Sequence, residues 1–304
     1  MLSTTRTPNE KRRALREGLA SGSIQRFPGA FTPLTAPLIQ QLGFEGVYIS
    51  GAVMAAELGL PDIGLTTLTE VAQRGREISR MTDLPTLIDA DTGFGEAMNV
   101  ARAVHELEDA GVSGLHLEDQ VNPKRCGHLD GKEVVPTEVA AQRIAAAVMA
   151  RRDPDLVIMA RTDIRGVQGL GAAIDRAKAL EAAGADAIFP EAMATLEEFA
   201  AIREAVQVPI LANMTEFGKS PLFTHQQLQD VGVSIAIHPV SLLRIAMGAI
   251  ERELGGLRET GTLDGAVDRM QTRARLYELN DYAAYSAFDE GVFDFEVPEG
   301  FHRA

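Results

Sequence analysis

The chain has 304 residues, of which 45% are hydrophobic and 24% charged, a composition typical of a folded globular protein. Its formal net charge of −14 disfavours a nucleic-acid partner, and its single cysteine, which cannot form an internal disulfide, favours a cytoplasmic protein. We find neither an apolar run of the ~20 residues that a membrane span needs nor the apolar segment of a secretory signal near the start.

Short apolar strands alternate with amphipathic helices along the chain. Eight strands are expected, in chain order, at 26–30, 47–50, 85–89, 115–118, 156–160, 187–190, 208–212 and 235–238. Four helices are expected to end at glycines that lead into the next strand, namely Gly43, Gly111, Gly184 and Gly232. Glycine is favoured there because it adopts the left-handed conformation that follows many helices.

Eight strands alternating with helices predict a closed (β/α)8 barrel of the TIM type. We expect one domain, 1–304, in which residues from about 250 onward form a C-terminal helical appendage packed on the barrel or on a neighbouring subunit. The rival fold is a doubly wound open sheet. That fold usually carries a glycine-rich phosphate turn after its first strand, and the sequence has none there.

Polar residues recur at the predicted strand ends. They are Ser50, Asp89 and Asp91, Glu118 and Asp119, Arg161 and Asp163, Glu191, Asn213 and Thr215, and His238. Active sites of (β/α)8 barrels lie at the C-terminal ends of the strands. This recurrence therefore predicts an active site at that end of the barrel.

The acidic residues at two strand ends predict a metal site. Residues two apart in a strand point the same way, so Asp89 and Asp91 should aim their carboxylates at one point. With Glu118 as a third oxygen donor, Mg²⁺ is the expected ion and Mn²⁺ a substitute. The alternative is structural: Asp89 caps a loop and Asp91 pairs with a nearby cation.

The arginines predict an anionic substrate. Arg161 follows apolar sequence and needs an anion, which is either Asp163 or a substrate carboxylate bound bidentately. Arg244 and Arg273 are further candidates, although each also fits an ordinary helix surface. A divalent metal beside several carboxylate anchors suits a small polycarboxylate.

The lone cysteine lies in a charged segment. Cys126 follows Lys124 and Arg125 and precedes His128, an unusual setting for a core residue. Because nearby cations favour the thiolate of a group whose ordinary pKa is about 8.5, Cys126 is a candidate acid or base. The alternative is a buried, inert cysteine.

Several motifs resemble the isocitrate lyase and phosphoenolpyruvate mutase superfamily. They are Leu87–Gly95, His116–Gln120, Pro123–His128 and Ala160–Asp163, and Asn213–Pro221 is similar to the 2-methylisocitrate lyase branch. The resemblance covers nearly the whole chain. It implies a (β/α)8 barrel and a homotetramer, a dimer of dimers, in which the last barrel helix is exchanged between paired subunits.

The resemblance also implies roles for single residues. Asp89 and Asp91 would hold Mg²⁺, with Glu118 in the outer shell, and Cys126 would be the catalytic acid, supported by Tyr48, Glu118, Lys124 and His128. Substrate would be bound by Ser50, Gly51, Ala52, Gly127, Arg161, Glu191, Asn213, Thr215, Arg244 and Arg273. One departure is Ala52, where the family usually has glycine, so the backbone geometry of that contact is open to question.

The implied reaction is a Mg²⁺-dependent cleavage of (2S,3R)-2-methylisocitrate to pyruvate and succinate, as in propionate catabolism through the methylcitrate cycle. Cys126 would protonate the succinate carbanion, and the base is Tyr48, Glu118 or a water. Other activities of the superfamily are alternatives: isocitrate, dimethylmalate or carboxyphosphonoenolpyruvate chemistry. A non-catalytic carboxylate-binding barrel is a further alternative.

Overall fold

The computed structural model describes residues 4–127 and 131–294. Eight strands lie within this part of the chain, and every pairing between them is parallel. Their bounds are β1 (Gln25–Pro28), β2 (Val47–Ile49), β3 (Thr86–Asp89), β4 (Gly114–Glu118), β5 (Val157–Thr162), β6 (Ala187–Pro190), β7 (Leu211–Asn213) and β8 (Ile235–His238).

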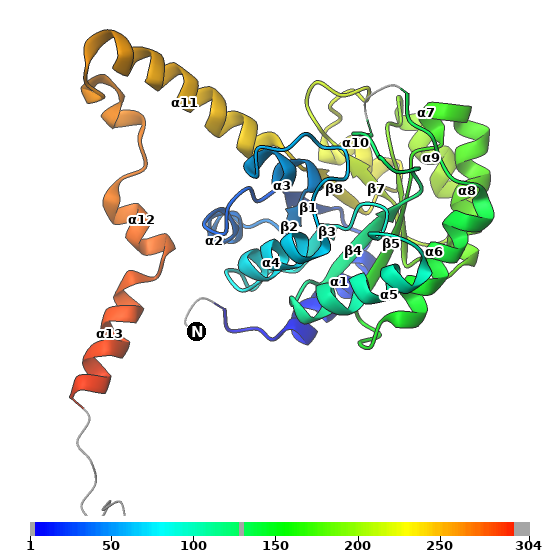
Figure 1. Ribbon diagram of the computed structural model, residues 1–304, viewed down its shortest axis with the longest axis horizontal. Coiled ribbons are helices and arrows are strands. Elements are labelled where there is room, and N and C mark those ends of the chain that lie inside the picture. The colour runs from blue at the N-terminus through cyan, green and yellow to red at the C-terminus, as the bar shows by residue number, and fades with distance from the viewer. Residues whose placement is uncertain (1–3, 128–130, 295–304) are drawn as a thin grey trace, which may run out of the picture.

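The strands close into a barrel. One run of hydrogen-bonded strands has the order β2-β3-β4-β5-β6 and the other has the order β1-β8-β7. Single bridges, Gly29 to Tyr48 and Ile188 to Ile210, join the two runs at both seams. The predicted (β/α)8 barrel is therefore confirmed, with helices on its outside (Figure 1).

Fourteen helical segments are described, most of them around the barrel. They are α1 (Pro8–Ala20), α2 (Thr35–Gln41), α3 (Gly51–Glu57), α4 (Leu68–Ser79), α5 (Ala97–Asp109), α6 (Thr137–Ala150), α7 (Arg165–Gln168), α8 (Leu170–Ala182), α9 (Leu196–Ala205), α10 (His225–Asp230), α11 (Ser241–Thr260), the 3₁₀ helix η1 (Asp264–Arg269), α12 (Arg273–Leu279) and α13 (Tyr282–Phe293). The four glycines predicted to follow helices have positive φ, 78° at Gly43, 83° at Gly111, 97° at Gly184 and 82° at Gly232.

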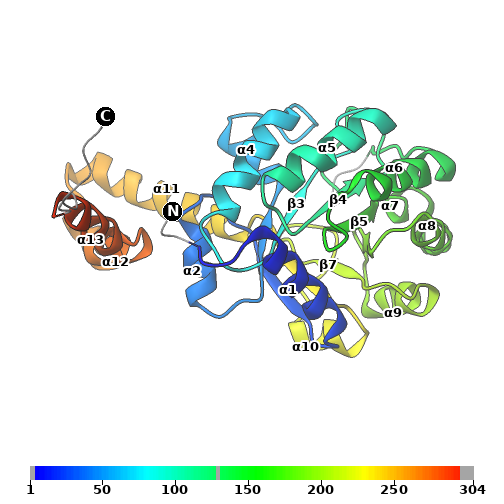
Figure 2. The same cartoon turned by 90° about the horizontal axis from the view of Figure 1, so that it is seen from below.

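Helix α1 closes the N-terminal end of the barrel, opposite the predicted active site (Figure 2). Leu15 packs into the barrel interior, which Phe27, Phe189 and other strand residues fill. Thr7 and Glu10 form a capping box that starts the helix. Lys11 donates hydrogen bonds to the carbonyls of Ser79 and Thr82, at 2.7 and 3.2 Å. With this end sealed, the opposite end is the one open to a ligand.

The seventh strand begins later than its sequence suggests. Residues 208–212 were expected to form it, but β7 runs from Leu211 to Asn213. Pro209 has no N–H to donate, and its carbonyl accepts a hydrogen bond from the Ile188 amide at 2.9 Å. The shift makes Asn213 the last residue of the strand.

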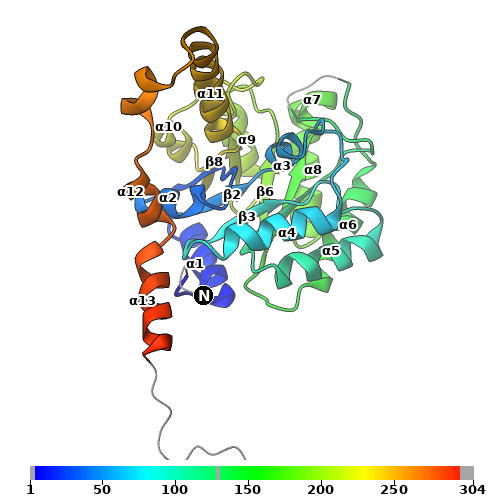
Figure 3. The same ribbon diagram turned by 60° about the vertical axis from the view of Figure 1, so that its left-hand side comes forward.

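The C-terminal segment leaves the barrel as an arm. Helix α11 points away from the barrel, and α12 and α13 continue from its far end (Figures 1 and 3). None of the residues of α11 or α13 is buried. A hydrogen bond from Arg275 to Gln41 links α12 to α2. The appendage expected from about residue 250 thus includes the second half of α11.

In the part of the chain that the structure describes, no helix combines the length and the apolar character that crossing a membrane requires.

Candidate active site

A cavity of about 120 Å³ opens at the C-terminal ends of the strands. Its walls come from several βα loops and from the start of α11. It is lined by Tyr48, Ser50, Ala52, Asp62, Asp89, Lys124, Cys126, Gly127, Arg161, Glu191, Asn213, Thr215, Pro239, Val240 and Arg244. The structure therefore brings most of the predicted site residues together around one small space.

A few predicted residues stand apart from this lining. Glu118 lies behind Arg161, and Gly51 and Asp91 lie beside Asp89. Arg273 begins α12 on the arm, so the structure does not bring it to the cavity of its own chain. His128 lies outside the described residues.

The carboxylates of Asp89 and Asp91 face one point. A Cβ atom added to Gly51 would lie 2.8 Å from Asp89 Oδ2 and 3.4 Å from Asp91 Oδ1. The convergence was expected from strand alternation, and that reason is wrong: β3 ends at Asp89, and Asp91 has a positive φ of 47°. A turn therefore brings the second carboxylate round to the first, and the amide of Asp91 donates to Asp89 Oδ1 at 3.0 Å.

Lys124 lies against this acidic pair. Its ammonium is 2.7 Å from Asp91 Oδ1 and also donates to Asp62. Burial raises the pKa of Asp91, and the charge of Asp89 raises it further. Burial opposes the charge of Lys124, but the surrounding carboxylates, chiefly Glu118 and Asp91, outweigh it and raise the Lys124 pKa. Lys124 is thus the nearby cation that the structural alternative expected for Asp91, and its single charge is shared among several carboxylates.

The donors of this site fit a magnesium ion. Oxygen ligands are those that Mg²⁺ prefers, and it usually keeps several waters. Among the residues described, no three His, Cys, Asp or Glu side chains form a ready-made metal cluster. Neither oxygen of Glu118 accepts a hydrogen bond within that part of the chain, and Oε1, the one that is not paired with Arg161, is able to accept one from a metal-bound water. Asp89 and Asp91 with water, supported by Glu118, are compatible with the ion.

Arg161 is held by two carboxylates at the cavity wall. Its Nε and one terminal nitrogen bind Asp163 at 2.9 and 3.3 Å, and that nitrogen is also 3.3 Å from Glu118 Oε2. Burial raises the pKa of Glu118 well above its ordinary value, although Arg161 acts to lower it. Asp163 therefore supplies the anion that Arg161 needs, and the guanidinium also lines the cavity.

Tyr48 rests on a buried histidine. The Tyr48 hydroxyl is 2.8 Å from His116 Nε2, and the rings are stacked with centroids 5.9 Å apart. His116 Nδ1 is 3.8 Å from Asp89 Oδ1. Burial raises the pKa of Tyr48 well above its ordinary value, so its hydroxyl keeps its proton at neutral pH.

His116 makes the stability of the fold depend on pH. Burial lowers its pKa from 6.5 to about 4, although the charge of Asp89 acts to raise it. Between these values the unfolded chain binds a proton that the folded chain does not, so stability is full above pH 6.5 and falls toward pH 4. We expect His116 to account for a loss of about 2 kcal/mol between pH 7 and pH 5.

Urea unfolding at the two pH values, with chelator present, measures this effect. His116→Asn should lose less stability on acidification than the wild-type protein. His105→Asn, on the exposed surface of α5, is the matched control and should behave like the wild type. An equal loss in His116→Asn and wild type would show that His116 is not the responsible group.

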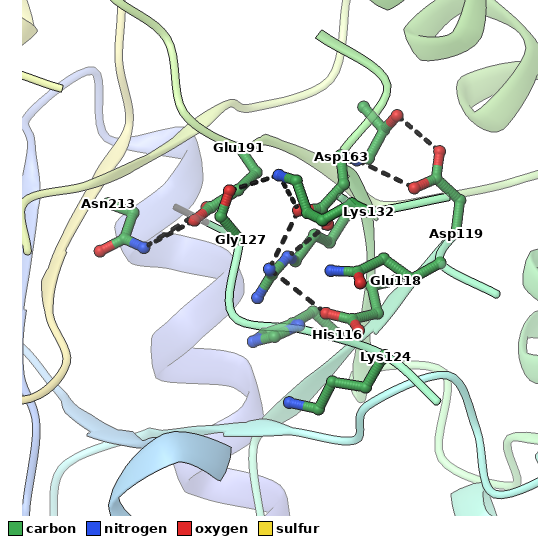
Figure 4. Close-up of polar contacts among 12 residues, drawn as sticks. His116, Glu118, Asp119, Lys124, Gly127, Lys132, Asp163, Glu191 and Asn213 are labelled. Atoms are coloured by element: carbon green, nitrogen blue, oxygen red, sulfur yellow. Dashed lines mark hydrogen bonds and ion pairs between the residues drawn. The ribbon is translucent and has the colours of Figure 1, made fainter. Parts of the chain in front are cut away.

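The peptide after Cys126 lies very close to other cavity residues. A Cβ atom on Gly127 would lie 2.3 Å from Glu191 Oε1 and 2.5 Å from an Arg161 nitrogen, so any larger residue here would displace these two side chains. The Asn213 amide donates to both oxygens of Glu191 at 3.3 Å (Figure 4). Cys126 itself is half-buried and lines the cavity, so it is not a fully buried cysteine.

The other rim of the cavity combines a helix start with the loop after β7. Ser50 caps α3, accepting a hydrogen bond from the Val53 amide at 3.4 Å. Ala52 lies within this helix and is not among the residues with positive φ, so alanine is compatible with its backbone. Arg244, from α11, donates to Thr215 at 3.1 Å and binds Glu216.

The sequence did not single out three side chains of the site. Asp62 lines the cavity from a loop after α3, Lys132 is buried behind Gly127, and His116 supports Tyr48. His116 alternates in register with Glu118 on β4, which could have identified it. Asp62 and Lys132 follow no strand, and in Pro61-Asp62 and Gly131-Lys132 each resembles an ordinary turn residue.

Comparison with known proteins agrees with these observations. Residues 15–258 match the family described as phosphoenolpyruvate phosphomutase. A protein of Corynebacterium glutamicum described as probable 2-methylisocitrate lyase 2 is 61% identical over 297 residues, which cover 98% of this chain and 97% of that protein.

Solved structures have the same fold. That of 2,3-dimethylmalate lyase, a member of the PEP mutase/isocitrate lyase superfamily, has a TM-score of 0.86 and 32% identity, with coverage of 97% of this chain and 100% of its own. The structure of phosphonopyruvate hydrolase in complex with oxalate and Mg²⁺ has a TM-score of 0.84 and 30% identity. The match covers 94% of this chain and 99% of the hydrolase chain. The chain therefore belongs to the phosphoenolpyruvate phosphomutase family, within the superfamily that also contains isocitrate lyase.

Proposed function

We propose that the protein is a Mg²⁺-dependent carbon–carbon lyase that cleaves 2-methylisocitrate to pyruvate and succinate. The observation that carries the proposal is the 61% identity, over nearly the full length of both chains, to a probable 2-methylisocitrate lyase. The cavity supports it independently, because it combines Asp89, with Asp91 beside it, two arginines and a thiol in a space suited to a small polycarboxylate.

The metal would be held by Asp89 and Asp91, directly or through water, with Glu118 in the outer shell. A related structure, that of phosphonopyruvate hydrolase, contains Mg²⁺ and the dicarboxylate oxalate. Bound here, Mg²⁺ would act as a Lewis acid toward the oxygens of the substrate. Mn²⁺ is the expected substitute because it accepts the same oxygen ligands.

Different residues of the cavity would bind different groups of a tricarboxylate substrate. Arg161 and Arg244 lie on the wall and supply positive charge to substrate carboxylates. Asn213 and Thr215, also in the lining, offer an amide and a hydroxyl. The amides at Ser50 and Ala52 lie at the start of α3, where backbone N–H groups favour an anion, whereas the Gly51 amide donates to Asp89 Oδ2 at 3.3 Å.

Cleavage requires one proton to leave and another to arrive. Loss of the C2 hydroxyl proton lets the bond to C3 break, which forms pyruvate and leaves the electron pair on succinate. Of the lining carboxylates, Asp62 neither holds the proposed metal nor accepts from Asn213, and it is a candidate base although it also accepts from Lys124. Tyr48 stays protonated and suits the role of hydrogen-bond donor.

Cys126 would deliver the second proton. It faces the same cavity as Asp62, and the thiol proton goes to the carbanion while the sulfur becomes a thiolate. The base and the acid thus come from different loops. Proton exchange with solvent after product release would restore both groups.

The arm would be buried against a second copy of the chain. Large apolar side chains on one side of α11 are exposed: Met247 by 54%, Ile250 by 47% and Leu254 by 57%. Such a face on a soluble protein marks an interaction surface. Exchange of α11 between the subunits of a homotetramer would cover this apolar face. The same exchange would allow Arg273 to approach the cavity of a paired subunit.

Placing charge on this face tests the assembly. We expect the double variant Ile250→Asp, Leu254→Asp to elute as a smaller species than the wild type, because burying two carboxylates in an apolar contact is costly. Light scattering coupled to size-exclusion chromatography measures the mass. Arg252→Asp, on the opposite face of α11, is the control and should retain four chains. A monomeric wild type would contradict the assembly.

Substrate preference separates this activity from its nearest alternative. The structural likeness to 2,3-dimethylmalate lyase favours that reaction as a second candidate. Initial rates on 2-methylisocitrate, isocitrate and 2,3-dimethylmalate, with Mg²⁺ and with chelator, distinguish them. We expect the highest kcat/KM on 2-methylisocitrate and loss of turnover with chelator. A higher value on dimethylmalate would overturn the assignment.

A further inference from the structure

Lys132 lies behind the cavity wall and is hydrogen-bonded to the backbone of Gly127, the residue after Cys126. Its ammonium donates to the Gly127 carbonyl and lies 2.9 Å from Asp163 Oδ1 (Figure 4). Only 3% of the Lys132 side chain and none of the Asp163 side chain is exposed. A lysine so deeply buried needs an anion, and Asp163 provides it.

Asp163 connects Lys132 to Arg161. The same carboxylate binds Arg161 through Nε at 2.9 Å and through a terminal nitrogen at 3.3 Å. One acidic group therefore sets the position of a guanidinium that lines the cavity and of an ammonium that holds a carbonyl at its edge.

Asp163 is itself fixed from behind. Its amide donates to Asp119 Oδ1 at 2.9 Å, and Asp119 Oδ2 accepts from Thr162 at 2.6 Å and from Arg176 at 2.7 Å. Asp119 and Asp163 are almost fully buried. Lys132 is thus attached to a rigid part of the barrel.

Gly127 links the position of Lys132 to that of the Cys126 thiol. Gly127 is packed so closely against Glu191 and Arg161 that a Cβ atom would lie within 2.5 Å of each. Cys126 directly precedes Gly127 in the chain and lines the cavity. A shift or tilt of the Gly127 carbonyl therefore moves the thiol relative to Arg161.

We propose that Lys132 is a positioning residue for the lyase reaction: it ties the Gly127 carbonyl to Asp163 and so sets where the Cys126 thiol lies relative to Arg161. The proposal rests on the function proposed above. A purely structural role, neutralising Asp163, is less well supported because Arg161 already binds both oxygens of that carboxylate.

The first test measures the position of the thiol without any turnover. Because the chain has one cysteine, alkylation by iodoacetamide, followed by mass spectrometry of the intact protein, reports on Cys126 alone. We expect Lys132→Met to be alkylated about tenfold faster than the wild type. A factor of about ten corresponds to the free energy of one charge-assisted hydrogen bond, here the bond from Lys132 to the Gly127 carbonyl. Lys178→Met, on the exposed surface of α8, is the matched control and should react at the wild-type rate.

The second test separates positioning from binding. Lys132 does not line the cavity, so Lys132→Met should leave KM within about threefold while kcat falls about 10²-fold, the cost of a misplacement of about 1 Å. Lys132→Arg keeps the charge and the donors and should recover part of kcat. If Lys132→Met does not fold, Lys132→Gln, which keeps a neutral donor, replaces it in both tests.

The proposal would be overturned if the folded Lys132 variants were alkylated at the wild-type rate and had the wild-type kcat. So would a fall in melting temperature and kcat with unchanged alkylation and no recovery in Lys132→Arg, since that pattern indicates a structural role alone. If the wild-type protein itself fails to cleave 2-methylisocitrate, the proposed function fails, and the alkylation rates still decide whether Lys132 positions the thiol.

Discussion

Cys126→Ser is expected to lower kcat by about 10³-fold and to leave KM nearly unchanged. General acid catalysis contributes about 10² to 10⁴ to a rate, and a serine hydroxyl is a far weaker acid than a thiol. The substitution removes no charge and keeps the shape of the side chain, so the carboxylate contacts made by Arg161 and Arg244 should persist. Steady-state kinetics on 2-methylisocitrate measure both constants.

Calorimetric titration of the variant with succinate controls for binding. Affinity within about threefold of the wild type would assign the loss to the proton transfer. Turnover at the wild-type rate would contradict the role of Cys126, and the acid would then have to be another group at the cavity. Equal losses in kcat and in succinate binding would instead indicate a damaged site.

Arg161→Lys is expected to lower kcat/KM by about 10³-fold. The planar guanidinium binds Asp163 along one edge and reaches Glu118 with a shared nitrogen, which a single ammonium cannot reproduce. A guanidinium held in this position would donate two hydrogen bonds to a substrate carboxylate, and since hydrogen bonds to charged groups contribute about 1.5 to 3 kcal/mol each, losing two of them accounts for this factor. The measurement is kcat/KM on 2-methylisocitrate.

Arg165→Lys is the matched control for this substitution. Arg165 also binds one carboxylate with two nitrogens, Glu198 at 2.7 and 3.1 Å, but it does not line the cavity. We expect kcat/KM of the control within about twofold of the wild type, since partly exposed ion pairs contribute little. Similar losses in the two variants would mean that the Arg161 effect is not specific to the site.

The barrel could be predicted from the sequence because its signals are local. A glycine after a helix and a short apolar run before a polar residue each reflect the conformation of a few neighbouring residues, and Gly43, Gly111, Gly184 and Gly232 have the positive φ they require. The start of β7 was misplaced because Pro209 and Ile210 have the apolar character of a strand, whereas strand pairing depends on available N–H groups.

The site could be predicted where it follows the strands and not where loops deliver it. Asp89, Arg161 and Glu191 end strands or follow them directly and line the cavity as expected. Asp119 also follows a strand, yet it binds Thr162 and Arg176 away from the cavity. Asp62 and Lys132 arrive from loops, so only long-range packing places them. The exposed apolar face of α11 resembles an ordinary amphipathic helix until the structure shows that its own barrel leaves it uncovered.

The most direct test of the proposed function is product analysis with (2S,3R)-2-methylisocitrate. The purified protein is incubated with the substrate and Mg²⁺, and the products are identified and quantified by ¹³C NMR. We predict pyruvate and succinate in equal amounts, no turnover after chelation, and full recovery when excess Mg²⁺ is added. Unchanged 2-methylisocitrate in the presence of Mg²⁺, or cleavage that continues undiminished in chelator, would contradict the proposal.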